Sequence, residues 1–336
     1  MPFPFKLPPA LLSTGRYLLA GLLLYWIFRK IDLAGLANAY QTTARWTIPL
    51  VELMTWTIMS LHAFRLWILV RAQSPDIRLL HTLKCHFTGS FYSTFLPSSV
   101  AIDIVRGYLL SRSTNPSVVW GATWVCKVMY LLGWILFCLG GLVALGGSVA
   151  GYNLYPVVGG LAAIVILCIS LSFSKRLSAP LRQPISRLLG TRIAHRLSEI
   201  RQSIYLYRTH APSLVLTALV TLTIHLIAII GTAFLIFGVS GSLFLEECFL
   251  FIPLVDMTTI LVPLTPNGLG IREALYDVLF GYLQLSDEQL AVFILLSALS
   301  YVLRVTGVLT VLWDRLRGHE TSSIPGQDVA RPDTLD

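Results

Sequence analysis

Charged and polar side chains gather at two proline-marked breaks inside hydrophobic sequence. The residues of interest at the first break are Pro97, Ser98, Ser99, Asp103 and Arg106. Those at the second break are Pro266, Asn267, Gly268, Gly270, Arg272 and Glu273. A lipid-exposed helix cannot stop in this way, because its freed backbone groups would find no water. Such breaks are typical of positions that face protein or a wet cavity, where membrane transporters keep their binding sites.

Each break is expected to open a new helix, with Ser98 or Ser99 capping the first and Asn267 capping the second. A helix N-terminus carries a partial positive charge and unpaired N–H groups, so it attracts anions. Four basic residues lie beside these helix starts or inside other hydrophobic segments: Arg106, Lys127, Arg272 and Arg304. Together these features predict a site for a phosphate-bearing headgroup.

A structural interpretation of the same charges stays open beside the binding one. Charges inside a membrane are costly unless they are paired, so Asp103 could pair with Arg106 or Arg272 and pin the broken segments together. Arg272 and Glu273 are adjacent and therefore leave a helix about 100° apart. We expect Arg272 to face the cavity and Glu273 to face a neighbouring span.

Three further charged residues are candidates for coupling or pairing. Asp256 lies in the middle of a hydrophobic segment, where it would serve as a proton or ion coupling site or as a partner for Lys127 or Arg304. Glu52 and Arg65 fall on roughly one face of a predicted span. Such intramembrane charges mark transport pathways or pair with one another.

The composition places the chain among membrane proteins. Of its 336 residues, 55% are hydrophobic and only 12% are charged, whereas a soluble domain carries roughly 25% charged residues. The sequence leaves no room for a sizeable soluble domain. It contains no G-x-S-x-G, HExxH or P-loop pattern, and its five cysteines are scattered. We therefore expect no catalytic residues, no cofactor and no metal site.

Spans that cross a membrane need about 20 mostly apolar residues. Six segments qualify: 11–28, 46–70, 117–147, 154–173, 212–240 and 288–313. Two further apolar regions, 80–110 and 246–284, contain the breaks. Each half of these regions spans about 20–24 Å as a helix, which is less than a full crossing. The prediction is an all-α integral membrane protein with six transmembrane helices and two broken re-entrant helical hairpins.

The basic residues orient the chain. Residues 174–211 hold eight Lys and Arg against one acid, so this short loop is placed in the cytoplasm, as are both termini. The half-repeats 11–147 and 154–313 then have opposite orientation, which makes an inverted repeat within one transmembrane domain, 1–317. The polar residues 318–336 are expected to form a disordered cytoplasmic tail.

The basic segment 174–211 also suggests partners. Between residues 185 and 208, apolar side chains recur at helical spacing, with most arginines off that face. This pattern predicts an amphipathic helix on the anionic phospholipid surface, with a solvated charged loop as the alternative. We expect no nucleic acid to bind there, because the segment lies between membrane spans. The paired glycines Gly140-Gly141, Gly146-Gly147 and Gly159-Gly160 are expected at close contacts between helices.

Both breaks resemble motifs of the lysylphosphatidylglycerol synthase transmembrane family, also called flippase-like integral membrane proteins. The first resembles an aromatic and glycine run followed by Leu-Pro-Ser, Asp and Arg, here Gly89 to Arg106 with Ala101-Ile102 in place of the family's glycine pair. The second resembles Pro-x-Gly-x-Gly-x-Arg-Glu, here Pro266 to Glu273. Arg65, Lys127 and Arg304 are further similar features, although Cys126-Lys127 stands where the family often has Glu-Arg.

The resemblance covers roughly residues 10–315 and implies movement of a lipid or lipid-linked headgroup across the bilayer. In the synthase branch a separate soluble domain transfers the aminoacyl group. Nothing in these residues would supply that domain, so we do not expect this chain alone to make lysyl-lipid.

The sequence therefore predicts a flippase of the inner, cytoplasmic membrane for a lipid with an anionic or phosphate-bearing headgroup. Two other functions stay open. One is a membrane enzyme or subunit that works with a cytoplasmic lipid-modifying transferase, with Asp103 or Glu273 as its base. The other is an ion channel that uses the opposed ends of the hairpins as its filter.

Overall fold

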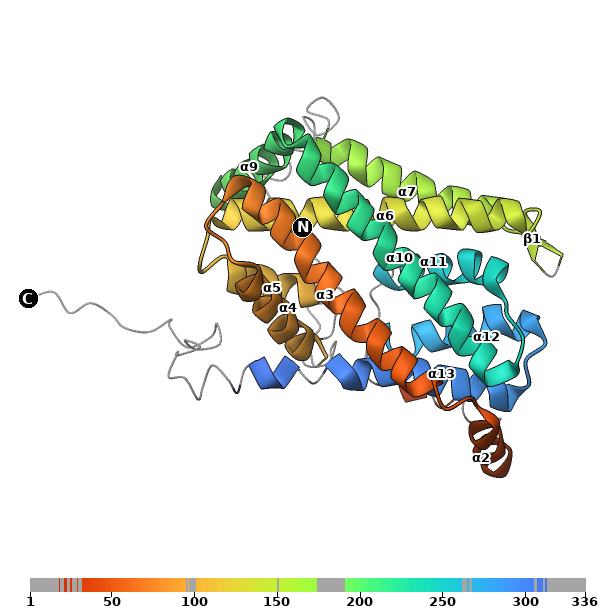
Figure 1. Cartoon of the computed structure of the whole chain (residues 1–336). Helices are drawn as coiled ribbons and strands as arrows, with labels where there is room; N and C mark the ends of the chain where they lie inside the picture. Colours follow the sequence, from red (N-terminus) through yellow and green to blue (C-terminus); the bar gives the residue numbers. More distant parts are fainter. Residues whose placement is uncertain are drawn as a thin grey trace, which may run out of the picture.

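The computed structural model describes residues 32–94, 96, 101–149, 151–173, 191–261, 265, 268–304 and 307–310, together with isolated positions between 18 and 29 and at 312. Within this part the fold is almost entirely helical (Figure 1). The helices of the first half are α2 (Leu33–Thr42), α3 (Thr47–Gln73), α4 (Leu79–Ser93), α5 (Ala101–Leu110) and α6 (Pro116–Ala144). Those that follow are α7 (Tyr155–Phe173), α9 (Thr191–Leu206), η1 (Tyr207–Thr209), α10 (Ala211–Ser240), α11 (Leu245–Leu261), α12 (Ile271–Phe280), η3 (Gly281–Leu283) and α13 (Asp287–Arg304).

Three of these helices are long and apolar enough to cross a membrane: α3, α6 and α10. They coincide with three of the six predicted spans. Helices α7 and α13 lie where two more spans were predicted, while the predicted first span, 11–28, falls mostly outside the described residues. A six-span topology therefore stays a prediction. The all-α prediction is confirmed for the described residues except for one minimal antiparallel pair, β1 (Ser148–Val149) with β2 (Tyr152–Asn153).

Both predicted breaks are present as interruptions between helices. Helix α4 ends at Ser93 and α5 begins at Ala101, and the two helices pack against each other. Helix α11 ends at Leu261 and α12 begins at Ile271, and these two also pack together. The order of a long helix, a broken pair and another helix thus occurs twice, as α3, α4–α5, α6 and as α10, α11–α12, α13. The inverted relation of the halves and the re-entrant course of the breaks stay predictions.

Local signals fix where the long helices begin and end. Helix α6 starts after Asn115, whose side chain accepts a hydrogen bond from the backbone N–H of Ser117 at 2.9 Å, and it carries Pro116 in its first turn. Helix α10 ends at Ser240 and is followed by Gly241, which adopts a left-handed φ of 77° that glycine tolerates without strain. These signals set the start of α6 and the end of α10, two of the helices that are long enough to cross a membrane.

The helices pack around two main apolar clusters. The larger joins α6, α10, α11, α12 and α13, and the second joins α3, α5, α6 and α9. Helices α3 and α10 lie side by side over much of their length (Figure 1). Their shared interface and the two broken pairs surround the central cavity described below.

The described part of the basic segment packs on the protein. Ile200, Ile204 and Tyr207 belong to the second apolar cluster, and the Tyr207 hydroxyl donates a hydrogen bond to the carbonyl of Leu69 at 3.0 Å. Ser203 contacts Gln73, with 3.0 Å between the side-chain oxygens. The apolar face predicted to lie on the lipid surface is therefore covered by α3 and α6 at residues 200–207, because protein side chains offer it the same burial as lipid would. Residues 174–190 and the predicted tail, 318–336, lie outside the described residues.

Candidate functional site

A cavity of about 260 Å³ lies between the long helices and the two broken pairs. Its charged lining consists of Arg65, Asp103, Arg106, Lys127, Asp256 and Arg272. Such a volume corresponds to roughly eight or nine water molecules at about 30 Å³ each. It lies just below the roughly 300–1,000 Å³ of sites that enclose a drug-sized ligand, so it suits a headgroup better than a whole lipid.

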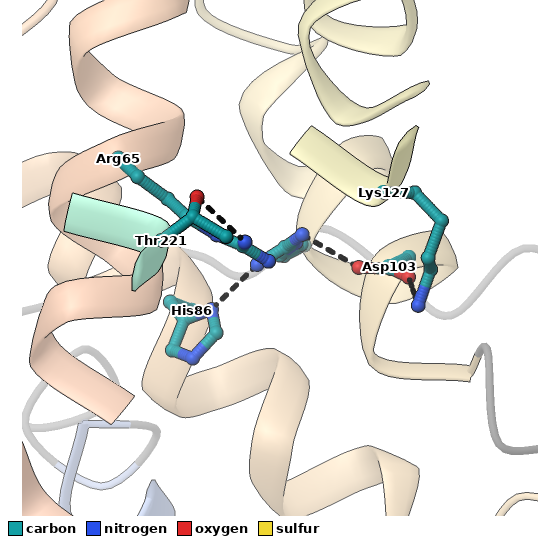
Figure 2. A network of polar contacts seen from close by, with 6 residues as sticks. Arg65, His86, Asp103, Lys127 and Thr221 are labelled. Carbon is teal, nitrogen blue, oxygen red and sulfur yellow. Dashed lines mark hydrogen bonds and ion pairs between the residues drawn. The ribbon is translucent and has the colours of Figure 1, made fainter. Parts of the chain in front are cut away.

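Asp103 binds two cations at once. Its Oδ1 accepts from a terminal nitrogen of Arg106 one helical turn away, and its Oδ2 lies 2.8 Å from the Lys127 ammonium. Figure 2 shows Arg65 and Lys127 reaching towards this network from opposite sides. The carboxylate ties α5 to α6, so of the two predicted pairings of Asp103 the one with Arg106 is present. Lys127 is a partner that the sequence did not suggest.

Arg106 continues the network to α4. Its guanidinium donates a hydrogen bond of 3.0 Å to Nδ1 of His86. A guanidinium can only donate, so Nδ1 is the acceptor and the proton of this ring sits on Nε2. His86 is thus held as a neutral imidazole, and the positive charge of this contact stays on Arg106.

Arg65 extends the network to α3 and α10. One terminal nitrogen donates to the Thr221 hydroxyl at 3.3 Å, and the guanidinium lies 5.0 Å from the centre of the Tyr130 ring. Arg65 is only 4% exposed. No carboxylate forms an ion pair with it among the described residues. Its charge is therefore buried against neutral groups.

Asp256, predicted as a coupling site or as a partner for a basic residue, contacts a tyrosine. Its Oδ2 accepts a hydrogen bond of 3.2 Å from the Tyr130 hydroxyl. The backbone carbonyl of Tyr130 accepts from Nε2 of His225 at 3.0 Å, and the His225 ring stacks on Trp134. This contact links α11 to α6 and α10. Among the described residues Lys127 pairs with Asp103, and no ion pair joins it to Asp256. Pairing of Asp256 with Arg304 and its role in coupling stay predictions, since the Arg304 side chain lies outside the described residues.

Arg272 and Glu273 diverge as expected, but the destination of Glu273 was predicted wrongly. Arg272 lines the cavity, and its Nε donates to the Tyr276 hydroxyl at 3.0 Å. Glu273 is buried and accepts from the backbone N–H of Gly270 at 2.6 Å, so its carboxylate caps the start of its own helix. Helix α12 begins only after Gly270, so Glu273 lies in its first turn and reaches back to the helix start.

The cavity brings together most of the predicted charged residues. Asp103, Arg106, Lys127, Arg272, Asp256 and Arg65 all line it. Glu52 is exposed on α3 and Glu273 caps α12, so neither belongs to this lining. The positions that lie outside the described residues are Pro97, Ser98, Ser99, Pro266, Asn267 and the side chain of Arg304. The glycines of the second break, Gly268 and Gly270, adopt left-handed φ values of 78° and 83°.

Several polar residues of the cavity were missed by the sequence interpretation: His86, Ser90, Tyr130 and Tyr276. Two of them had a readable signal. Tyr276 lies four residues after Arg272 and Tyr130 three after Lys127, so each shares a helix face with a predicted site residue. His86 and Ser90 are brought in only by the packing of α4 on α5.

The lining has an excess of positive charge. Four described cationic side chains face two carboxylates, which leaves two positive charges when the histidines are neutral. Cations without counter-charges are costly in a dry interior, so this wall favours an anionic guest. Among the described residues, no group of three or more His, Cys, Asp or Glu side chains forms a potential metal site.

The sequence of the chain matches one known protein family over most of its length. The family model described as the lysylphosphatidylglycerol synthase TM region matches residues 13–307. No curated protein and no solved structure matches the chain. Because the family match covers most of the 336 residues, this chain belongs to the lysylphosphatidylglycerol synthase transmembrane family.

Proposed function

We propose that this protein moves a lipid with an anionic or phosphate-bearing headgroup across the cytoplasmic membrane. The observation that carries the proposal is the cationic cavity between membrane-grade helices. An ion in such a place must be matched by a partner, and the described wall leaves two positive charges unmatched. The family, which is membrane-embedded and related to lipid handling, supports the same conclusion.

Both broken pairs contribute to the cavity wall. Asp103 and Arg106 come from the helix after the first break, and Arg272 comes from the helix after the second. A headgroup held between them would contact both halves of the chain at once. The small volume leaves the acyl or prenyl tail outside, in the lipid. Movement of one half against the other would then pass the headgroup from one leaflet to the other.

The contacts favour transport over the enzyme alternative. The two carboxylates that would serve as a base are both occupied, since Asp103 binds Arg106 and Lys127 and Glu273 caps its helix. A base held by two cations is a weak proton acceptor. The channel alternative predicts ionic current without lipid movement. We expect no ionic current through the reconstituted protein. We also propose that both termini lie in the cytoplasm. A cytoplasmic lipid-modifying transferase remains a proposed partner of the protein.

The proposal is tested by lipid movement in proteoliposomes. Purified wild type and Arg272→Ala are reconstituted with fluorescent phospholipids or polyprenyl phosphates, and a quencher reports the leaflet of each dye. We expect movement with the wild type and at least a tenfold slower rate with Arg272→Ala. Arg71→Ala is the matched control, because Arg71 is an exposed arginine outside the cavity. Absence of movement for every lipid, with folded protein, would overturn the proposal.

A further inference from the structure

The positive charge of the cavity wall is distributed unevenly over the helices. The second broken pair contributes Arg272 and Asp256, whose opposite charges cancel in the sum, and Asp256 binds the hydroxyl of the Tyr130 ring beside Arg65. Helices α3, α5 and α6 contribute Arg65, Arg106 and Lys127, which share the single carboxylate of Asp103. The excess of two positive charges therefore comes from the wall that α3, α4, α5 and α6 form.

Hydrogen-bond donors in this wall lack acceptors. Three buried donors have no hydrogen-bond partner among the described residues: Nε of Arg65, Nε of Arg106 and the hydroxyl of Ser90. All three residues line the cavity and are at most 4% exposed. A buried donor without an acceptor costs free energy comparable to a lost hydrogen bond, so three such donors in the lining of one cavity indicate that the cavity takes an acceptor group.

The geometry points to a phosphomonoester. We propose that the cavity wall formed by α3, α4, α5 and α6 binds a doubly charged terminal phosphate, with Arg65, Arg106 and Ser90 as its donors. A phosphomonoester carries close to two negative charges at pH 7 and three acceptor oxygens. A phosphodiester carries one charge and would leave one of the two cations unmatched. This inference rests on the proposed function and narrows its headgroup to one class.

Two neighbouring contacts support a ligand role for Arg65. Among the residues that the structure describes, the Arg65 guanidinium lies over the Tyr130 ring and donates its hydrogen bond to the neutral Thr221, so these contacts position the side chain without neutralising its charge. Arg106 keeps one nitrogen on Asp103 and another on His86, which fixes its plane while Nε stays unused. Two oriented guanidinium groups suit the several oxygens of one phosphate.

Binding can be measured with a matched pair of probes. Farnesyl phosphate is the monoester, and its methyl ester is the diester with the same tail and one charge fewer. Dissociation constants are measured for the full chain in phosphatidylcholine nanodiscs at pH 5.5 and 7.5. The second pKa of a phosphomonoester is about 6, so its dianion fraction rises about fourfold over this range. We expect the preference for the monoester over the diester to rise about fourfold as well.

The diester serves as the control for titration of the protein. His62 and His86 line the cavity, so the pH dependence of the diester, whose own charge does not change between pH 5.5 and 7.5, reports any effect of the protein itself. The rise in preference is read as the change in the monoester's dissociation constant relative to that of the diester. Equal dissociation constants for the two probes at pH 7.5 would overturn the inference.

Substitutions test the named donors. Arg65→Gln is expected to weaken farnesyl phosphate binding at least tenfold, and Arg65→Lys to restore part of the loss by keeping the charge. Arg71→Gln, on the exposed face of the same helix, is expected to change nothing. Ser90→Ala, a small change in a buried position, gives a second test with less risk to folding. Unchanged affinity in folded Arg65→Gln and Ser90→Ala would contradict the inference.

Two further comparisons are needed. One distinguishes a soluble from a lipid-borne phosphate, and the other separates this inference from the proposed function. Tight binding of inorganic phosphate would support the phosphomonoester site and assign it to a soluble ligand, whereas selective binding of farnesyl phosphate assigns it to a lipid. If phosphodiester lipids move in proteoliposomes but the monoester is not preferred, this inference fails and the proposed function stands. If the monoester binds but no lipid moves, the proposed function fails and the site stands.

Discussion

Asp103 is the residue on which the charge network depends, because it contacts both Arg106 and Lys127. Asp103→Asn would leave these two cations without a carboxylate. Removing one partner from a buried ion pair costs about 3–5 kcal/mol. We expect a clearly lower unfolding temperature in detergent, measured by intrinsic tryptophan fluorescence.

Lys127→Gln is the matched comparison for that prediction. The Lys127 side chain is 24% exposed, and Arg106 would still hold Asp103 after the change. Its effect on the unfolding temperature should be markedly smaller than that of Asp103→Asn. An equal or larger loss with Lys127→Gln would show that Asp103 is not the centre of the network.

Glu273 provides a test of a purely structural role. Its carboxylate caps α12 by accepting from the Gly270 N–H, so Glu273→Ala should cost about 0.5–2 kcal/mol. Glu273→Gln retains an acceptor oxygen and should fold and move lipid like the wild type. Unfolding in denaturant and the proteoliposome assay check both expectations. Loss of lipid movement in a stable Glu273→Gln protein would instead give Glu273 a role in the substrate site.

Helix packing depends on glycine at one position of the predicted pairs. A Cβ on Gly141 would lie 2.6 Å from the backbone nitrogen of Leu250, whereas one on Gly140 would meet nothing within 4 Å. Gly141 therefore lets α6 and α11 approach closely. Gly146 and Gly147 have φ values of 65° and 80° and form a turn, in which a Cβ on Gly147 would clash with the Tyr155 ring. The close contacts predicted at Gly146, Gly159 and Gly160 are wrong, because a Cβ at each of them would meet nothing within 4 Å among the described residues.

The two adjacent glycines give an internal control. Gly141→Leu should separate α6 from α11 and cost about 1–3 kcal/mol or more, because backbone atoms cannot yield as side chains do. Gly140→Leu should leave the unfolding temperature nearly unchanged. Thermal unfolding of the two variants in the same detergent compares them directly, and similar losses in both would contradict the close contact.

The helices and their breaks were predictable from sequence because hydrophobic length and proline are local signals. The contacts inside the cavity were harder to predict from the sequence. Arg65 meets Thr221 across 156 positions of the chain, and no local pattern announces such a pair. Glu273 was misplaced because the start of α12 was expected near Asn267, whereas the helix begins after Gly270. A shift of three residues moved this side chain from the second turn into the cap.

At the scale of the whole molecule, the distribution of basic residues predicts the orientation. Arg112 is expected on the cytoplasmic side and Ser242 on the outer side, and both residues are exposed. In a cysteine-free background, Arg112→Cys in right-side-out vesicles should react with a membrane-impermeant maleimide only after the membrane is opened. Ser242→Cys should react at once. The reverse pattern would invert the topology.

The central claim is that a lipid headgroup passes through the cavity, and blocking the cavity tests it most directly. Thr232 lines the cavity on α10, whereas Leu219 is exposed on the same helix. Thr232→Cys and Leu219→Cys, each in the cysteine-free background, are treated with a membrane-permeant maleimide, and lipid movement is followed in proteoliposomes. We predict that the label stops movement in Thr232→Cys and leaves it intact in Leu219→Cys. Full movement by labelled Thr232→Cys would contradict the account, because the lipid would then cross by another route.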